Sequence, residues 1–180
     1  MSPGMRKLAL TVHLILSVGW IGAVLAYLAL DVFAVTSTDT EIARGSWIAM
    51  ELTARYVIVP LALASLATGL IMALGTPWGL FGHYWVLISF ALTVLATVVL
   101  VAHLSDISAM AAGPHSSGGQ GHGSSTASGA RSDFLHAGGG LVVLVFITAL
   151  NTYKPRGLTP YGWRQHIASR GTAARSATPD

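Results

Sequence analysis

The distribution of charge divides this chain into long segments that contain no Asp, Glu, Lys or Arg. Three apolar runs of this kind are Leu8–Leu30, Tyr56–Ser105 and Phe134–Asn151. Because a helix needs about 20 apolar residues to cross a bilayer, the middle run holds two spans, separated by the Gly- and Pro-containing stretch Gly75–Gly79. The sequence therefore predicts an all-α integral membrane protein built as a four-helix bundle.

The composition agrees with a membrane protein, since 53% of the residues are hydrophobic and 9% are charged. The first apolar run is longer than the 7–15 residues of a signal-peptide core, so we interpret it as a retained span. The chain contains no cysteine, which excludes disulfides and thiolate metal sites. The expected spans are about 8–30, 54–75, 83–105 and 133–152.

The basic residues predict the orientation of the bundle. Arg6 and Lys7 precede the first span, and five of the ten Lys and Arg residues follow the fourth. By the positive-inside rule both termini face the cytoplasm. We expect residues 156–180 to form a disordered basic tail that meets anionic lipid. Nucleic-acid binding is not expected, because no basic and aromatic surface accompanies the charge.

The two outer connections differ in character. Residues 38–55 carry charges at helical spacing, including a Glu51–Arg55 pair at i,i+4, and should extend the second helix beyond the outer surface. Pro60 should kink this helix. The stretch Gly113–Arg131 is rich in Gly and Ser and should be a flexible loop.

Four histidines, which are candidate ligands, lie near the ends of apolar segments: His13, His83, His103 and His136. The third and fourth helices should be antiparallel neighbours, so His103 and His136 fall at similar depth on the outer side and can face each other across one cofactor. His13 and His83 both fall on the inner side, less evenly. The two histidines of the third helix are 20 residues apart, about 160° in azimuth and roughly 30 Å in height, and cannot share a metal.

Two local patterns adjoin these histidines. A single stripe at helical spacing on the first helix contains His13, Ser17, Trp20, Val24 and Tyr27. His13 could therefore be a ligand, or could form a hydrogen bond across the bundle. The run of three glycines after His136, residues 138–140, weakens its helix and indicates that something bulky approaches the backbone. That could be a neighbouring helix or the flat face of a macrocycle.

Several short motifs resemble known membrane proteins. HLILSVGWIG, TGLIMALG and WGLFGHYWVLISFALTV look like the four-helix core shared by copper-resistance D-type membrane domains. FGHYWVL, HAGGGLVVL and YKPRGLTPYG resemble more closely an uncharacterised group of actinobacterial four-span membrane proteins. The resemblance covers most of the chain outside the Gly/Ser loop and implies a bacterial plasma membrane protein.

The arrangement is also loosely similar to four-helix di-haem b-type cytochromes. That resemblance implies haem b held by paired histidines, electron transfer in or across the membrane, and a quinone, a redox protein or a second copy of the chain as partner. His103 and His136 would hold the outer haem, with Arg55 near its propionates and Gly139 and Gly140 at its face. A second haem at His13 and His83 would depart from the roughly four-turn spacing that these cytochromes use.

Two other functions remain open from the sequence. Copper handling would use imidazole and thioether ligands near the outer loop, namely His103, Met110, His115, His122 and His136. The methionines form no paired motif, and His115 and His122 could equally be solvated loop residues. A structural or partner-binding membrane protein is the third alternative, since no catalytic constellation is present and enzyme activity is left open.

The haem hypothesis predicts a reduced-minus-oxidised spectrum with a sharp b-type band in membranes enriched in this protein. The band should disappear in His103→Ala or His136→Ala, because each substitution removes an axial ligand. A colourless, correctly inserted protein purified from haem-replete cells would contradict the hypothesis.

Overall fold

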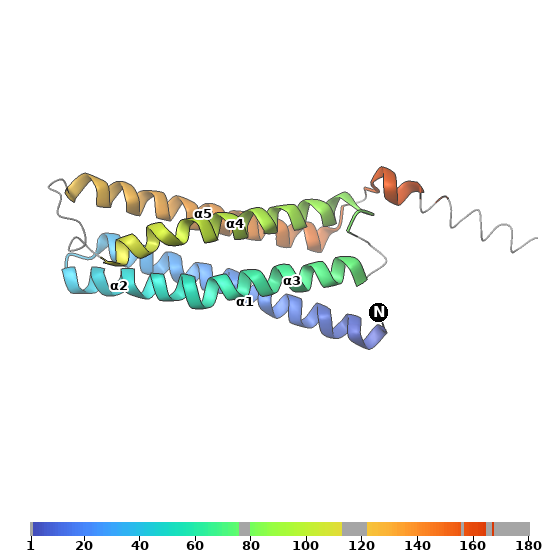
Figure 1. Cartoon of the computed structure of the whole chain (residues 1–180), viewed down its shortest axis with the longest axis horizontal. Coiled ribbons are helices and arrows are strands. Elements are labelled where there is room, and N and C mark those ends of the chain that lie inside the picture. The colour runs from blue at the N-terminus through green and yellow to red at the C-terminus, as the bar shows by residue number, and fades with distance from the viewer. Residues whose placement is uncertain (1, 76–79, 113–121, 156, 165–166, 168–180) are drawn as a thin grey trace, which may run out of the picture.

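The bundle consists of four long helices that lie side by side (Figure 1). The computed structural model describes residues 2–75, 80–112, 122–155, 157–164 and 167. The helical segments are α1 (Pro3–Thr36), α2 (Thr40–Thr53), the π-helix η1 (Ala54–Ile58), α3 (Val59–Gly75), α4 (Tyr84–Ala112) and α5 (His122–Tyr153). α2, η1 and α3 form one continuous helix, so four helices are long and apolar enough to cross a membrane. The predicted all-α fold with four apolar helices is confirmed.

The helices extend past the charge-free runs because their ends are set by capping groups. The Ser2 hydroxyl caps α1 by accepting a hydrogen bond from the Met5 backbone N–H, and Pro3 stands in the first turn, where its missing N–H costs nothing. The Asp39 carboxylate caps α2 in the same way through the Glu41 N–H at 2.9 Å. At its other end α1 stops at Thr36, where the Ser37 N–H donates to the Phe33 carbonyl, more than a turn beyond the predicted end at residue 30.

The irregularity expected at Pro60 takes the form of a π-helical turn. Pro60 has no N–H to donate and its ring crowds the carbonyl one turn earlier. η1 immediately precedes it, and the Val59 N–H donates to the Ala54 carbonyl instead of the one four residues back. A π-turn of this kind is a common cause of a helix bend.

The fourth helix begins earlier than predicted. Residues 122–131 are helical, although they belong to the stretch 113–131 that was expected to be a flexible loop. Once a helix is nucleated, each further residue adds a hydrogen bond at little cost, so the long helix continues into this polar segment. Residues 113–121, including His115, lie outside the described chain.

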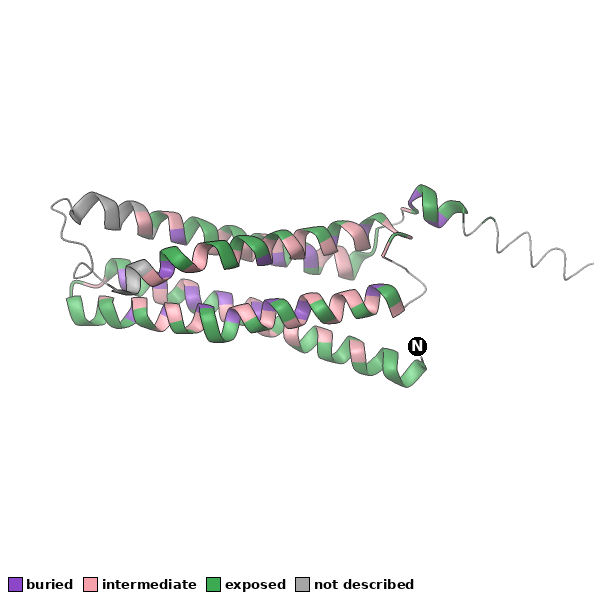
Figure 2. Ribbon diagram, viewed as in Figure 1, coloured by how far each residue is buried: buried purple, intermediate pink, exposed green. Residues whose placement is uncertain are grey.

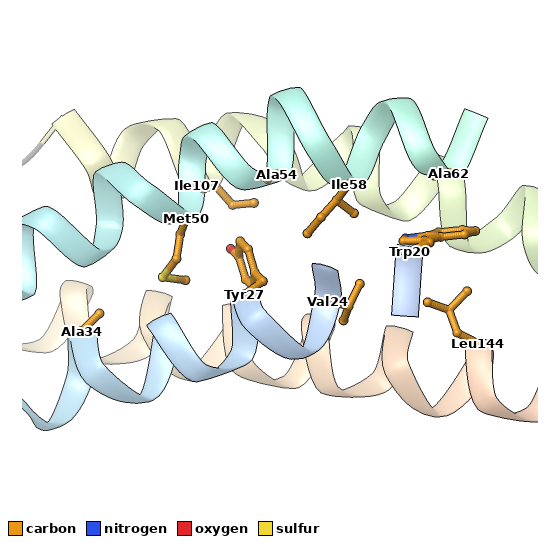
Figure 3. Packing of buried hydrophobic residues seen from close by; sticks show 10 residues of the cluster. All are labelled: Trp20, Val24, Tyr27, Ala34, Met50, Ala54, Ile58, Ala62, Ile107 and Leu144. Carbon is orange, nitrogen blue, oxygen red and sulfur yellow. The ribbon is translucent and has the colours of Figure 1, made fainter. Parts of the chain in front are cut away.

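The packing places a narrow buried core along the axis of the bundle. α1 packs against α2, α3 and α5, and α4 packs against α5, α3 and α2, which confirms α4 and α5 as neighbours. The predicted stripe of α1 is confirmed, with Trp20, Val24 and Tyr27 buried among Met50, Ile58 and Leu144 (Figure 3). Most outward-facing side chains are exposed (Figure 2), and many are large and apolar. Such a surface suits lipid rather than water.

The beginning of the C-terminal tail is ordered against the start of α4. Leu158 forms an isolated β-bridge with His83, and the Thr159 N–H donates to the Gly82 carbonyl at 3.1 Å. The Thr159 hydroxyl accepts from the Gly162 N–H at 3.1 Å and starts a short helix at 160–164. An N-cap residue and a bridge thus hold 157–164, at the start of the tail that was expected to be disordered, and disorder of the tail stays a prediction.

This docking predicts that Gly162→Ala destabilises the protein. A Cβ at Gly162 would collide with the backbone carbonyl of Gly82, whereas a Cβ at Gly157 would meet the Tyr84 ring at an ordinary 3.7 Å. We expect Gly162→Ala to cost about 1–3 kcal/mol and to increase proteolysis of the tail, with little effect of Gly157→Ala. Thermal unfolding and limited proteolysis in detergent micelles would measure both, and equal behaviour of the two variants would contradict the docking.

Candidate functional site

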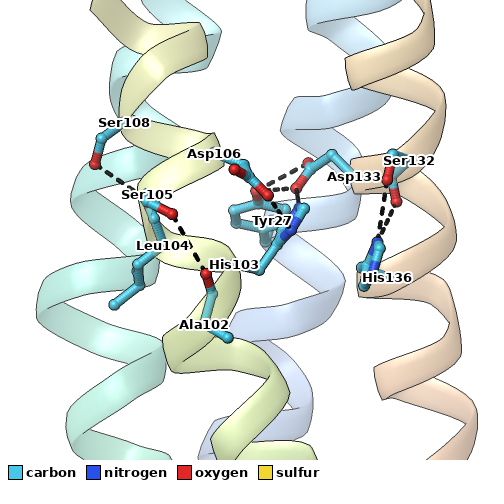
Figure 4. Close-up of polar contacts among 10 residues, drawn as sticks. All are labelled: Tyr27, Ala102, His103, Leu104, Ser105, Asp106, Ser108, Ser132, Asp133 and His136. Atoms are coloured by element: carbon cyan, nitrogen blue, oxygen red, sulfur yellow. Dashed lines mark hydrogen bonds and ion pairs between the residues drawn. The ribbon is translucent and has the colours of Figure 1, made fainter.

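A buried carboxylate joins three helices in the outer half of the bundle, the end at which α1 stops and α2 begins. The Asp133 side chain on α5 is 1% exposed. Its oxygens accept hydrogen bonds from the Tyr27 hydroxyl of α1 at 2.9 and 3.0 Å. The Nε2 of His103 on α4 lies 3.0 Å from the same carboxylate (Figure 4). Asp133 is thus the meeting point of α1, α4 and α5.

The imidazole of His103 connects this buried acid to the surface. Its Nδ1 lies 3.1 Å from the Asp106 carboxylate, which is 66% exposed, while the His103 side chain is 12% exposed. Carboxylate oxygens accept hydrogen bonds, so both contacts are satisfied when both ring nitrogens of His103 carry a proton. An imidazole can take up a proton at one nitrogen and release one at the other. The arrangement is therefore chemically able to pass a proton between the buried Asp133 and the exposed Asp106.

His136 lies directly against His103. The two rings are stacked, with centroids 4.4 Å apart and an interplanar angle of 17°. The Nδ1 of His136 lies 2.7 Å from the backbone carbonyl of Ser132. Because a carbonyl accepts, Nδ1 carries the proton in the neutral ring and Nε2 holds the free lone pair. The structure thus brings together the two histidines that the sequence placed at matched depth.

An apolar cavity of about 310 Å³ lies on the inward side of these histidines. Its walls come from α1, η1, α4 and α5, and Gly139 and Gly140 are part of the lining. A Cβ at any of residues 138–140 would meet no atom within 4 Å. The glycine run therefore leaves open space and does not serve close approach of a neighbouring helix.

The geometry of the His103–His136 pair tests the fit of a haem iron. An imidazole nitrogen lies about 2 Å from a metal, so two axial ligands hold their nitrogens about 4 Å apart and their ring centres farther apart still. Stacked rings at 4.4 Å do not fit an iron between them, and both nitrogens of His103 face carboxylates. In this arrangement His136 alone presents a lone pair.

His13 and His83, the two histidines predicted on the inner side, have different surroundings. The Nδ1 of His13 lies 2.9 Å from the Thr68 hydroxyl, and its ring packs over Gly69, where a Cβ would meet it at 3.2 Å. His83 pairs through its backbone with Leu158, and its ring lies near Trp85. The contact of His13 is the hydrogen bond across the bundle that the sequence left open as an alternative to ligation.

Arg55 lies in the same half of the bundle as His103, and its guanidinium is already engaged. Its Nη2 donates to the Ser108 hydroxyl at 3.1 Å and lies 3.6 Å from the Glu51 carboxylate. The predicted i,i+4 pair is confirmed, and it is accompanied by a link to α4. A cofactor carboxylate at this place would have to compete with Glu51 for the guanidinium.

A second buried acid, Asp31, is the residue that the sequence reasoning missed. Its side chain is fully buried, and neither carboxylate oxygen has a hydrogen-bond partner among the described residues. The signal was present, because Asp31 continues the stripe of α1 one turn after Tyr27. Asp133 and Asp106 were missed in the same way, each three residues from a histidine already singled out.

The copper hypothesis concerns residues that the structure largely leaves undescribed. His115 and the side chain of His122 lie outside the described residues. Within the described chain, no group of three or more His, Asp or Glu side chains is arranged to hold a metal. Copper capture by the loop stays a prediction.

The fold defines the class of this protein as a helical bundle with four candidate membrane spans. No family model, curated protein or solved structure matches the chain. The resemblances drawn from short motifs therefore stay predictions, and the side chains at the outer end carry the functional argument.

We expect removal of the two carboxylates that contact His103 to lower the free energy of unfolding by different amounts. Asp133→Ala leaves the His103 ring and the Tyr27 hydroxyl buried without a partner, which we expect to cost about 3–5 kcal/mol. Asp106→Ala removes an exposed partner of the same imidazole and should cost about 0–1 kcal/mol. Reversible unfolding in mixed micelles would measure both variants, and equal losses would show that Asp133 does not hold the three helices together.

Proposed function

We propose that this protein binds a lipid-soluble ring compound of the quinone class in the outer-half cavity and exchanges protons between that site and the outer side of the membrane. One observation carries the proposal. The His103 imidazole is held between a buried and an exposed carboxylate at the polar end of an apolar cavity. Ionisable side chains inside a membrane bundle are expensive, and they commonly mark proton or ion pathways.

The cavity supports a ligand that arrives from the lipid. Its rim includes apolar side chains that are more than 40% exposed, namely Leu95, Val99 and Leu135. In a bilayer these residues would meet lipid, so a hydrophobic molecule could enter sideways between α4 and α5. The volume is at the lower end of the range for small-molecule pockets, which suits a one- or two-ring head better than a macrocycle.

The polar end of the cavity supports a ligand that gives or takes protons. The Nε2 lone pair of neutral His136 can accept a hydrogen bond from a hydroxyl of a quinol, and the protonated ring can donate one to a quinone carbonyl. A quinol that passes two electrons to a redox partner protein also releases two protons. His136, stacked on His103, stands next to the His103–Asp106 pair that could carry them outward.

The side of the membrane follows from the charge distribution. The Lys and Arg residues before the first span and after the fourth favour cytoplasmic termini by the positive-inside rule, which supports an outward direction for the proposed proton path. In that orientation Asp106 releases protons at the outer surface of a bacterial plasma membrane.

Haem b is the second candidate, and a single observation favours it. The tautomer of His136, with Nδ1–H donating to a backbone carbonyl, is the one typical of a metal-ligating histidine. Haem in this cavity would supply one-electron chemistry, with Gly139 and Gly140 beside its face. It would require His103 to leave its carboxylates or a different second ligand. The absorbance spectrum separates the two candidates, since a bound quinone gives no b-type band.

Filling the cavity should abolish ligand binding. Gly140 lines the cavity, Gly138 does not, and added side chains at either position meet open space. We expect saturable binding of a short-chain quinone to the full chain in nanodiscs, measured by quenching of tryptophan fluorescence. Gly140→Leu should weaken this binding at least about tenfold, because a larger side chain would occupy the space of the ligand.

Gly138→Leu is the matched control and should bind as the wild type does, since both substitutions replace a helical glycine by leucine in the same turn. Absence of saturable binding to the wild type would refute the quinone proposal. Equal loss in both variants would place the ligand outside this cavity.

A further inference from the structure

We propose that Asp31 is a binding site for one small monovalent cation, a proton or Na⁺, that is taken up from the outer side. Asp31 and Asp133 are two acids buried in the same half of the bundle. Two ionised carboxylates in one buried region repel each other more strongly than they would in water, because the local dielectric constant is low. Asp133 has donors around it, whereas neither Asp31 oxygen has a partner among the described residues. The proposal does not depend on the quinone proposal.

The surroundings of Asp31 offer no internal counter-charge. It stands between Tyr27 and Ala34 on one face of α1, and both belong to the buried cluster with Met50 and Ile107. Figure 3 shows Met50 opposite this stretch of α1. The Tyr27 hydroxyl, the donor one turn away, is directed to Asp133. An ionised carboxylate buried without a partner is strongly unfavourable.

A count of charges in the outer half gives the valence of the missing ion. In this half Asp39, Glu41, Arg44, Tyr56, Asp106 and Arg131 are exposed; the other charged and titratable groups are Tyr27 and Asp31 on α1, Glu51 on α2, Arg55 on η1, His103 on α4, and Asp133 and His136 on α5, and α3 contributes none. Arg55 pairs with Glu51. His103, when it carries both protons, neutralises Asp133. One buried negative charge, that of Asp31, remains, and one monovalent cation balances it.

A cation bound at Asp31 would change the electrostatic potential at Asp133. An ionised Asp31 repels the negative charge of Asp133, because both carboxylates lie in the same buried, low-dielectric half of the bundle. A cation on Asp31 removes this repulsion. Cation uptake at Asp31 is therefore coupled to the charge that Asp133 carries.

The test compares the full-length protein with Asp31→Asn and with Asp106→Asn as the matched control, all in nanodiscs. Asn has nearly the shape of Asp and removes the charge, and Asp106 belongs to the same network but is exposed. One measurement is equilibrium binding of ²²Na⁺ at pH 8. The other is the thermal unfolding midpoint between pH 5 and 9, with choline chloride replacing NaCl at constant ionic strength.

If the occupant is Na⁺, we expect one ²²Na⁺ per chain in the wild type and in Asp106→Asn, and loss of this binding in Asp31→Asn. If the occupant is a proton, ²²Na⁺ does not bind. The wild type and Asp106→Asn then lose several degrees of unfolding midpoint as the pH rises, because a ligand that binds the folded state stabilises it. In Asp31→Asn, the part of this fall in unfolding midpoint that comes from deprotonation of Asp31 should be absent.

Identical behaviour of Asp31→Asn and the wild type in both measurements would overturn the proposal. If Asp31→Asn does not fold, Asp31→Ser replaces it. A wild type that neither binds ²²Na⁺ nor is stabilised by acid overturns the proposal without any variant.

Discussion

The carboxylate of Asp133 is the contact on which the outer half of the bundle depends. In lipid, apolar side chains gain little by leaving one apolar environment for another, so polar contacts between helices contribute much of the specificity of packing. Asp133 supplies three such contacts, two from the Tyr27 hydroxyl of α1 and one from His103 of α4. The inner half instead joins α1 to α3 through neutral pairs, Ser17 with Ser65 and His13 with Thr68. Among the described residues, the two buried carboxylates, Asp31 and Asp133, thus both lie in the outer half.

The positions of the spans were predictable because charge is excluded from the hydrocarbon region over whole turns of helix. The same rule is the reason why the two buried acids were not predicted from the sequence. Asp31 and Asp133 are the first charged residues beyond the ends of their runs, so a count of charges assigns them to the surface. α1 continues past Asp31 to its C-cap at Ser37, and α5 begins at His122, well before Asp133, so both acids lie within helices and are buried. Helical spacing from Tyr27 and His136 would have shown that both acids share a face with residues already expected inside.

The sequence predicted the depth at which the two histidines of the candidate site lie, but it did not predict which groups their rings contact. Antiparallel neighbours of known length bring His103 and His136 to one level, and the structure places them in contact. Whether two imidazoles stack or face each other depends on side-chain rotamers and on partners from other helices. Here Asp133 and Asp106 hold both nitrogens of His103, and the Ser132 carbonyl holds His136. None of these partners follows from the spacing of the histidines, so a pattern typical of metal ligands forms a network suited to protons.

The separation of the cavity from Asp31 explains how one end of a bundle could serve two ligands. The cavity is lined by Tyr27, His103, Asp133 and His136, so a molecule bound there would contact the network through groups that are able to exchange protons. Asp31 lies one turn farther out and acts on the network by charge alone. A ligand in the cavity and a cation at Asp31 would therefore influence each other through Asp133 without touching. Because such coupling is reciprocal, any cation that changes ligand affinity must itself bind with an affinity that depends on the ligand.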